Sequence, residues 1–176
     1  MRFIGFLRGI NVGGHHKLPM QDLRDKLGEL GCEHVKTILN SGNFVFESHK
    51  KDIQELEQKM EDALSNSFGF PVPVILRSRE EVLDLVSQNP FSAFDVHKNM
   101  RLYVSFLKRT PETKINTPYI SNDKSFKIIG LQDKNIFSVL DLSVTTTPKG
   151  MDNLEKLFGK NITTRNWNTI EKLMML

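Results

Sequence analysis

Hydrophobic and polar positions at the start of the chain follow first a strand pattern and then a helix pattern. Residues 2–10 (RFIGFLRGI) are mostly apolar and predict a strand. Apolar side chains then recur at helical spacing from Met20 to Leu30, with Pro19 before the first turn and Gly31 after the last. These positions predict a strand followed by a helix.

The same alternation continues to residue 78. Two β-branched and aromatic runs, 35–39 and 44–48, are joined by the turn-forming residues NSGN and predict a hairpin. Apolar positions between Ile53 and Phe68 predict a longer helix, and residues 72–78 (VPVILRS) predict a further strand. The resulting order, βαββαβ, is that of a ferredoxin-like unit.

The second half repeats this plan more loosely. Strand patterns cover residues 101–107, 126–131 and 135–142, and a helical pattern covers 151–159. Residues 111–120 (PETKINTPYI) are interpreted as a degraded helix. The sequence therefore predicts an α+β fold of two similar subdomains with mostly antiparallel sheets and helices on one face.

Two helices connect or end these subdomains. Ser78 and Glu81 have the spacing of a capping box, which opens a helix that stops before Pro90. The last segment, 163–176, is predicted to be a terminal helix capped by Thr164. We place the expected division at residues 1–77 and 78–176.

Composition is that of a soluble globular protein. Of the 176 residues, 39% are hydrophobic and 26% are charged, with a net charge of +3. The chain has a single cysteine, Cys32, so it has no intramolecular disulfide framework, and it has no apolar run of about 18 residues, so no membrane span is expected. A cytoplasmic location is predicted.

A glycine-rich loop follows the first strand and is the first candidate site. Glycines allow the backbone to approach an anion, and basic side chains supply charge. No Lys-Ser/Thr pair follows Gly14, so the loop is not a P-loop. The alternative is a tight turn whose glycines occupy positive-φ positions. The candidate residues are Arg8, Gly9, Asn11, Gly13, Gly14, His15, His16 and Lys17.

The adjacent histidines of this loop do not indicate a metal site. His15 and His16 point in different directions, and no carboxylate or cysteine stands at ligand spacing. We expect neither a metal ion nor a cofactor.

The NSGN turn is the second candidate. The first helix returns the chain, so the strand before this turn starts where the first strand started. The glycine-rich loop and the turn should therefore lie at the same end of the sheet. Asn40, Ser41, Gly42 and Asn43 would then face the loop, and the side chains of Asn40, Ser41 and Asn43 could hydrogen-bond a polar ligand held over the glycines. The same residue types also serve any hairpin.

The third candidate is the segment TTRNWNT. Arg165 in the first turn of the predicted helix would oppose the helix dipole, unless an anion were bound there, and Asn166 would share that site. The alternative is a helix docked through Trp167, with Arg165 paired to a carboxylate.

Three segments of the chain resemble the hallmark motifs of a bacterial family known as domain of unknown function 1697. They are FLRGINVGGHHKLPM, NSGNFVF and TTRNWNTIEKL, in that order. The resemblance covers essentially the whole chain. It implies an α+β fold of two related subdomains and no particular reaction. The motifs map onto Arg8, Gly9, Asn11, Gly13, Gly14, Lys17, Ser41, Gly42, Asn43, Thr164, Arg165, Asn166 and Trp167.

The leading functional hypothesis is binding of an anionic, phosphorylated small molecule or nucleotide. Arg8 and Lys17 would supply charge, and the amides of Gly13 and Gly14 would contact the anion. Asn11, Ser41 and Asn43 would orient it.

Three alternatives remain open from sequence. Nucleic acid could bind an open sheet face if phenylalanines of the strands were exposed. An enzyme could use Ser41 with His15, although no orienting carboxylate is identifiable. The motifs could also stabilise the junction between the two halves. Composition does not indicate an oligomeric state.

Overall fold

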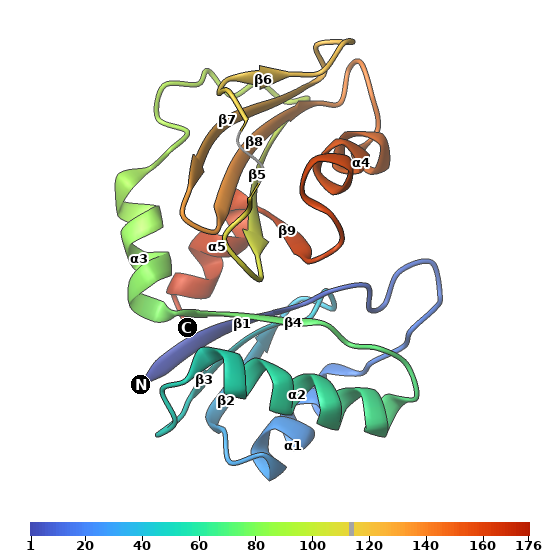
Figure 1. The fold of residues 1–176 in the computed structure, drawn as a ribbon, viewed down its shortest axis with the longest axis vertical. Coiled ribbons are helices and arrows are strands. Elements are labelled where there is room, and N and C mark those ends of the chain that lie inside the picture. The colour runs from blue at the N-terminus through green and yellow to red at the C-terminus, as the bar shows by residue number, and fades with distance from the viewer. Residues whose placement is uncertain (113–114) are drawn as a thin grey trace. The chain divides into compact units, whose positions relative to one another are not determined.

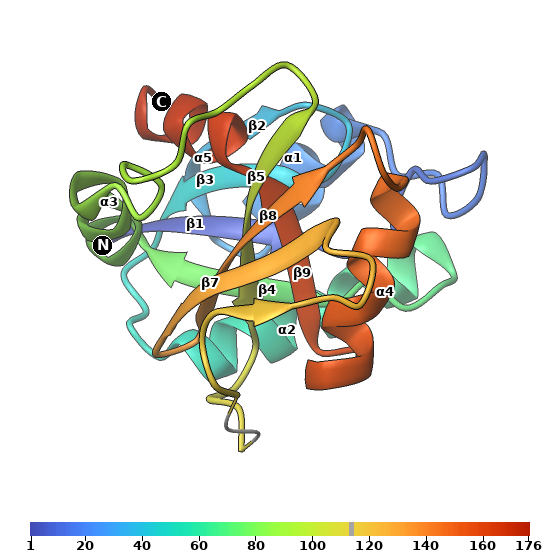
Figure 2. The same cartoon turned by 90° about the horizontal axis from the view of Figure 1, so that it is seen from above.

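The computed structural model describes residues 1–112 and 115–176. Packing divides the chain into unit 1, Met1–Asp84 with Glu171–Leu176, and unit 2, Leu85–Ile170. The sequence predicts a boundary between residues 77 and 78, where the βαββαβ pattern ends. By packing, residues 78–84 and 171–176 instead belong to unit 1. Each unit has its own antiparallel sheet (Figures 1 and 2).

Unit 1 has the ferredoxin-like order that the sequence predicts. Its sheet has the strand order β2-β3-β1-β4, with all neighbouring strands antiparallel. β1 and β2 therefore run in the same direction, as expected. Its elements are β1 (Arg2–Leu7), α1 (Met20–Glu29), β2 (Glu33–Ile38), β3 (Asn43–Glu47), α2 (Ile53–Phe68), β4 (Val74–Ser78) and the start of α3 (Arg79–Gln88).

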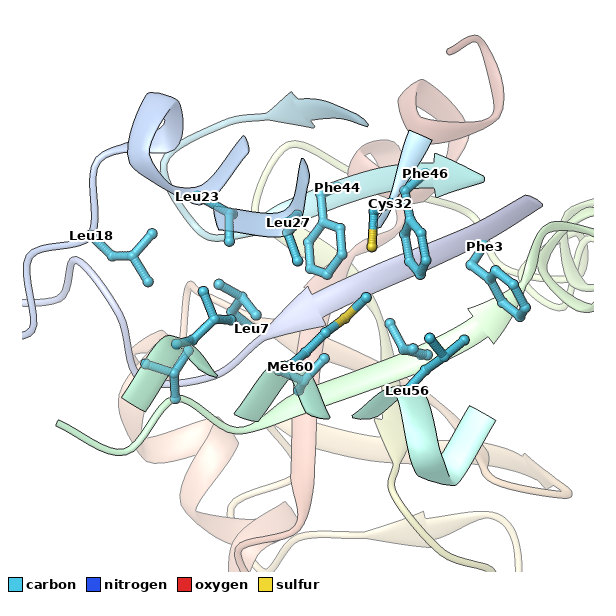
Figure 3. Close-up of a cluster of buried hydrophobic side chains, with 14 of the residues drawn as sticks. Phe3, Leu7, Leu18, Leu23, Leu27, Cys32, Phe44, Phe46, Leu56 and Met60 are labelled. Atoms are coloured by element: carbon cyan, nitrogen blue, oxygen red, sulfur yellow. The ribbon is translucent and has the colours of Figure 1, made fainter. Parts of the chain in front are cut away.

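α1 and α2 pack on one face of this sheet and form the core of unit 1. Figure 3 shows phenylalanines of β1 and β3 meeting leucines and a methionine of the two helices. Gly5 of β1 pairs with Phe44, and a Cβ on Gly5 would lie 2.1 Å from Cζ of that ring. The missing side chain thus makes room for Phe44. The labelled core residues include Phe3, Leu7, Leu23, Leu27, Phe44, Phe46, Leu56 and Met60.

Glutamate carboxylates accept hydrogen bonds from the unpaired edge of β4. Because β4 lies at the edge of the sheet, its amides that face away from β1 need other acceptors. Three glutamates supply them: Glu61 accepts from Val74 at 2.8 Å, Glu57 from Leu76 at 2.8 Å, and Glu81 from Ser78 at 2.7 Å. The amide of Glu81 in turn donates to Ser78 Oγ at 3.1 Å, which confirms the predicted capping box.

Unit 2 repeats the topology of unit 1. The order of four of its strands, β7-β8-β5-β9, corresponds to β2-β3-β1-β4, and α4 lies between β8 and β9 in the chain as α2 lies between β3 and β4. This correspondence confirms two similar subdomains. The elements are the end of α3, β5 (Met100–Leu107), β6 (Tyr119–Ile120), β7 (Phe126–Gln132), β8 (Asn135–Asp141), α4 (Thr147–Phe158), β9 (Ile162–Asn166) and the start of α5 (Trp167–Met174).

The two faces of the unit 2 sheet pack differently. Ile136 and Leu140 of β8 pack with Leu154 of α4 on one face. Phe137 points to the other face, where Phe91 meets it edge-on at 6.1 Å and meets Trp167 at 5.1 Å between ring centroids. The tryptophan therefore docks the start of α5, as its position in the motif predicted.

Two helical predictions in unit 2 are wrong. The described residues of 111–120 contain no helix, and Tyr119–Ile120 instead forms β6 beside β7. Pro111 and Pro118 account for this, because proline removes a backbone donor and disfavours a helical conformation before it. Residues 113–114 of that prediction lie outside the described residues.

The second error concerns residues 162–166, which form β9 and pair with β5. The β-branched run Ile162, Thr163 and Thr164 favours a strand. α5 begins only at Trp167, and the amide of Asn168 donates to Asn166 Oδ1 at 3.0 Å. Asn166, and not Thr164, thus supplies the side-chain cap.

No helix among the described residues is long and apolar enough to cross a membrane.

Candidate functional site

The glycine-rich loop after β1 is a small hairpin that projects from the end of the strand (Figure 1). The amide of Asn11 donates to the carbonyl of His16 at 3.0 Å, and the amide of His15 donates to that of Val12 at 3.0 Å. Gly13 and Gly14 at the tip have φ values of 58° and 79°. Positive φ at both central positions is the pattern of a type I′ turn, so these glycines are required by the turn itself.

Asn11 ties this hairpin to the β2–β3 turn. Its Nδ2 donates to the carbonyl of Asn40 at 2.8 Å and to that of Leu18 at 2.9 Å. Its Oδ1 accepts from the amide of Leu18 at 2.8 Å. The side chain therefore holds the loop through three hydrogen bonds.

His16 anchors the base of the same loop. Its Nδ1 lies 3.0 Å from the carbonyl oxygen of Gly9, and its ring stacks on Phe70 at 4.6 Å between centroids. Both histidines are exposed, but the His15 side chain makes no hydrogen bond or ring contact within the described part of the chain. The two adjacent histidines thus have separate surroundings. Among the described residues, no group of three His, Cys, Asp or Glu side chains is placed to hold a metal ion.

The NSGN turn lies beside the loop, as the strand directions required. The amide of Leu7 donates to the carbonyl of Gly42 at 2.8 Å. Gly42 has φ 71°, and a Cβ there would lie 2.7 Å from Cβ of Leu7 and 2.8 Å from Cδ1 of Ile10. Only glycine fits this close approach. The predicted adjacency of residues 8–18 and 40–43 is therefore confirmed.

Ser41 and Asn43 stabilise the turn. Asn43 is completely buried, and its Nδ2 donates to Ser41 Oγ at 2.9 Å and to the carbonyl of Ile38 at 3.1 Å. A side chain with no exposed surface does not reach a ligand in solvent. The exposed residues of the turn are Asn40 and Ser41.

A cavity of about 380 Å³ lies between the loop and the turn. Lys17 is its cationic residue, Leu18 and Pro19 are its apolar ones, and Asn40 comes from the opposite side. Sequence reasoning missed Leu18 and Pro19, although Pro19 was visible as a helix-start signal. The lining residues are Asn11, Gly14, Lys17, Leu18, Pro19 and Asn40.

Several expected site residues do not line this cavity. Arg8 is half-buried, and its backbone amide donates to the carbonyl of Pro73 at 3.1 Å. Gly13 and His15 lie farther out on the hairpin. Ser41, Gly42 and Asn43 belong to the NSGN turn but do not line the cavity. The cavity therefore takes Asn11, Gly14, Lys17 and Asn40 from the predicted set.

The third motif belongs to unit 2. Arg165 lies on β9 opposite Val104, and its Nη1 donates to Thr163 Oγ1 at 2.7 Å and to the carbonyl of Thr164 at 2.8 Å. Burial lowers its pKa to about 10. The expectation of an Arg in the first turn of a helix is therefore wrong, because the residue lies in a strand.

The burial of individual side chains bears on two further sequence-based hypotheses. The strand phenylalanines that could have stacked on nucleic acid (Phe3, Phe6, Phe44, Phe46 and Phe106) are all completely buried, and Tyr103 is half-buried. Cys32 is also buried, and burial raises the pKa of its thiol to about 11. Its thiol stays protonated at neutral pH, as expected for an inert side chain.

Comparisons with known proteins agree with this fold. No curated protein matches the chain. A solved structure of a conserved bacterial protein from Streptococcus pneumoniae, SP0830, is 26% identical and superposes with a TM-score of 0.74, covering 99% of this chain and 97% of that one. A family described as protein of unknown function (DUF1697) matches residues 1–137. The fold, the ordered motifs and this match together show that the chain belongs to the DUF1697 family.

Proposed function

We propose that this protein binds an anionic small molecule, a nucleotide or another phosphorylated compound, in the cavity between the glycine-rich hairpin and Asn40. The observation that carries the proposal is the cavity itself, which has about 380 Å³ of space and one cationic side chain. Cavities of about 300–1,000 Å³ are typical of small-molecule sites.

Lys17 is the residue assigned to the anion. It is exposed and makes no ion pair within the described part of the chain. The amide of Gly14 also donates to no acceptor in residues 1–112 and 115–176. An ammonium group and a spare amide are both favourable partners for a phosphate oxygen.

The other lining residues would hold the rest of the ligand. Leu18 and Pro19 offer apolar surface for a base or another uncharged body, and the Asn40 amide offers a donor and an acceptor. Asn11 acts on the ligand only by fixing the distance between the hairpin and the turn. This assignment keeps the residues of the sequence-based set that line the cavity and adds Leu18 and Pro19 to them.

Binding is favoured over catalysis by the composition of the cavity. No carboxylate is among the described residues that line it, and the Ser41 hydroxyl already accepts a hydrogen bond from Asn43. General acid–base chemistry at neutral pH most often uses a histidine or a carboxylate within reach of the substrate, and neither is among the described residues that line the cavity. We also propose a cytoplasmic location, because a single buried cysteine, Cys32, suits a reducing compartment.

The experiment is a thermal-shift and calorimetry series with ATP, AMP, ribose 5-phosphate, inorganic phosphate and adenosine. A bound ligand at 100 times its Kd stabilises the fold by about 2.7 kcal/mol, which gives a clear rise in Tm. We expect at least one phosphorylated compound to raise Tm and adenosine to do so less.

Two charge-matched variants locate the effect. Lys17→Gln should weaken binding about tenfold, and Lys51→Gln, which removes an exposed lysine outside the cavity, should leave it unchanged. Equal binding to both variants, or a flat response of the wild type to every phosphorylated compound, would contradict the proposal.

A further inference from the structure

Unit 2 contains a second cavity, of about 370 Å³, at the start of β5 and the end of β9. It is formed entirely within unit 2 by the loop before β5, the first residues of β5, and the junction of β9 with α5. None of the three clusters noted in the sequence includes its cationic residues. Its lining residues are Val96, His97, Lys98, Met100, Arg101, Leu102, Asn166 and Asn168.

Arg101 is held in place at this cavity by backbone carbonyls. Its Nη1 donates to the carbonyl of Lys98 at 2.7 Å and to that of Met100 at 2.9 Å. Its Nε and Nη2 donors make no hydrogen bond within the described part of the chain. The guanidinium is thus fixed in orientation while part of its donor fork remains available to a ligand.

Lys98 supplies a second positive charge. Its side chain is exposed and has no ion-pair partner among residues 1–112 and 115–176. His97 also lines the cavity, and its proximity contributes to the lowered pKa of Asp141, after hydrogen bonds from Ser143. Lys98 and Arg101 are thus two cations at this cavity that make no ion pair within the described part of the chain.

Asn166 adds a neutral donor of defined direction. Its Oδ1 accepts from the amide of Asn168, which fixes the side-chain amide with Nδ2 as its unused end. No other hydrogen bond engages the side chain of Asn166 in the described part of the chain. Arg101, Lys98 and Asn166 therefore offer donors and no acceptor, which favours an anion over a neutral sugar or a cation.

We propose that this cavity is a second anion site, which binds a phosphate monoester through Arg101, Lys98 and the Nδ2 of Asn166. Two unmatched cations suit the dianionic charge of a phosphate monoester, and the planar guanidinium suits its oxygen geometry. Val96 is 56% exposed beside these groups, and with Leu102 it offers apolar surface for the organic part of the ester. The site is independent of the cavity that contains Lys17.

The test uses phenyl phosphate as the probe, with inorganic phosphate and benzyl alcohol as the phosphate-only and ring-only compounds. Amide chemical shifts in the NMR spectrum of the full chain locate binding, and calorimetry at fixed ionic strength gives Kd. We expect shifts at residues 96–102 and 166–168, with phenyl phosphate binding at least threefold more tightly than inorganic phosphate and benzyl alcohol not binding.

Variants separate the site from general charge effects. Arg101→Gln should weaken phenyl phosphate binding at this site about tenfold and Lys98→Gln several-fold, with the amide spectrum showing that each variant is folded. Lys149→Gln removes an exposed lysine of α4 outside the cavity and should change nothing, and Lys17→Gln should leave the shifts in unit 2 intact. Lack of shifts at 96–102, or equal Kd values in Arg101→Gln and Lys149→Gln, would overturn the proposal.

Discussion

Asn11 Nδ2 donates to the backbone carbonyl of Asn40 at 2.8 Å, across 29 residues of sequence. This hydrogen bond links the glycine-rich hairpin to the β2–β3 turn, and both segments contribute to the cavity. Asn11 also has φ 54°, a left-handed conformation that asparagine tolerates better than most residues. One residue thus meets a backbone requirement and a side-chain requirement together.

Substitution of Asn11 should separate these two requirements. Asn11→Gly keeps the left-handed backbone but loses the side-chain bonds to Asn40 and Leu18, at a net cost of about 1 kcal/mol in the free energy of unfolding. Asn11→Ala adds the strain of a Cβ at positive φ, about 1 kcal/mol more. Urea denaturation followed by far-UV circular dichroism measures both. Equal stability of the two variants would show that the left-handed conformation of residue 11 does not affect the free energy of unfolding.

Gly42→Ala should be more damaging than any other single methyl added in the site. The new Cβ would meet Leu7 Cβ at 2.7 Å and Ile10 Cδ1 at 2.8 Å, at φ 71°. Overpacking and backbone strain together predict a loss of about 2–4 kcal/mol in the free energy of unfolding. The same urea denaturation experiment gives the value.

Two other glycines serve as controls for this substitution. Gly14→Ala has the same sign of φ, but no atom lies within 4 Å of the new Cβ, so only strain of about 1–2 kcal/mol is expected. Gly28→Ala, inside α1 and also in open space, should stabilise by about 0.5–1 kcal/mol. A Gly42 variant no less stable than the Gly14 variant would contradict the close approach.

Much of unit 1 could be predicted from sequence because its signals are local. Helix periodicity, Gly69 after α2 and the Ser78–Glu81 spacing each act within a few residues. The adjacency of the two motifs also followed, since it depends only on strand direction. The hydrogen bonds of Asn11 did not follow, because the same residue type serves equally well in a ligand contact or in a turn.

The terminal motif shows why other parts of the structure could not be predicted from the sequence. Trp167, Ile170 and Leu173 have helical spacing, and this pattern predicts a helix that starts as early as Thr163. In the structure, Thr163–Asn166 instead pair with β5. The choice between strand and helix there depends on a non-local partner, β5. The cavity around Arg101 was missed for the same reason, since its lining residues come from segments more than 60 residues apart in the printed sequence, 96–102 and 166–168.

Two completely buried serines of the unit 2 sheet should respond oppositely to truncation. Ser105 Oγ lies 2.7 Å from Thr164 Oγ1 across β5 and β9, whereas Ser138 Oγ has no hydrogen-bond partner in the structure as described. Ser105→Ala should destabilise by about 1–2 kcal/mol, because Thr164 loses its partner. Ser138→Ala should be neutral or stabilising, since it removes an unsatisfied hydroxyl. Urea denaturation compares them, and a larger loss for the Ser138 variant would show that its hydroxyl is in fact satisfied.

Glu57 should be essential to the edge of the unit 1 sheet. It is 3% exposed and accepts from the amide of Leu76, and burial lowers the pKa of Arg77 while Glu81 and Glu57 oppose that effect. Glu57→Ala leaves a buried amide without its acceptor and should destabilise by about 2–4 kcal/mol. Glu57→Gln keeps an acceptor oxygen and should lose less. Hydrogen exchange at Leu76 is the local readout, and unchanged protection in the alanine variant would contradict this role.

Asp123 should give the protein a local dependence on acid pH. Hydrogen bonds from Ser121 Oγ, Ser125 Oγ and the Ser125 amide lower its pKa from 3.8 to about 2. A lowered pKa means that the folded state favours the carboxylate, so this stabilisation is complete above about pH 4 and is lost as the pH falls through about 2. Titration of the Asp123 carboxyl carbon by NMR measures the midpoint directly.

The stability difference between wild type and Asp123→Asn tests the consequence. Asparagine keeps an acceptor oxygen but has no charge, so the wild type should be the more stable protein at pH 5, and its advantage should shrink as the pH falls toward 2. Asp133→Asn, at the exposed β7–β8 turn, is the matched control, because its carboxylate has no hydrogen-bond partner in the described part of the chain. A constant difference for the Asp123 variant across this range would show that the three serine hydrogen bonds do not favour the charged form.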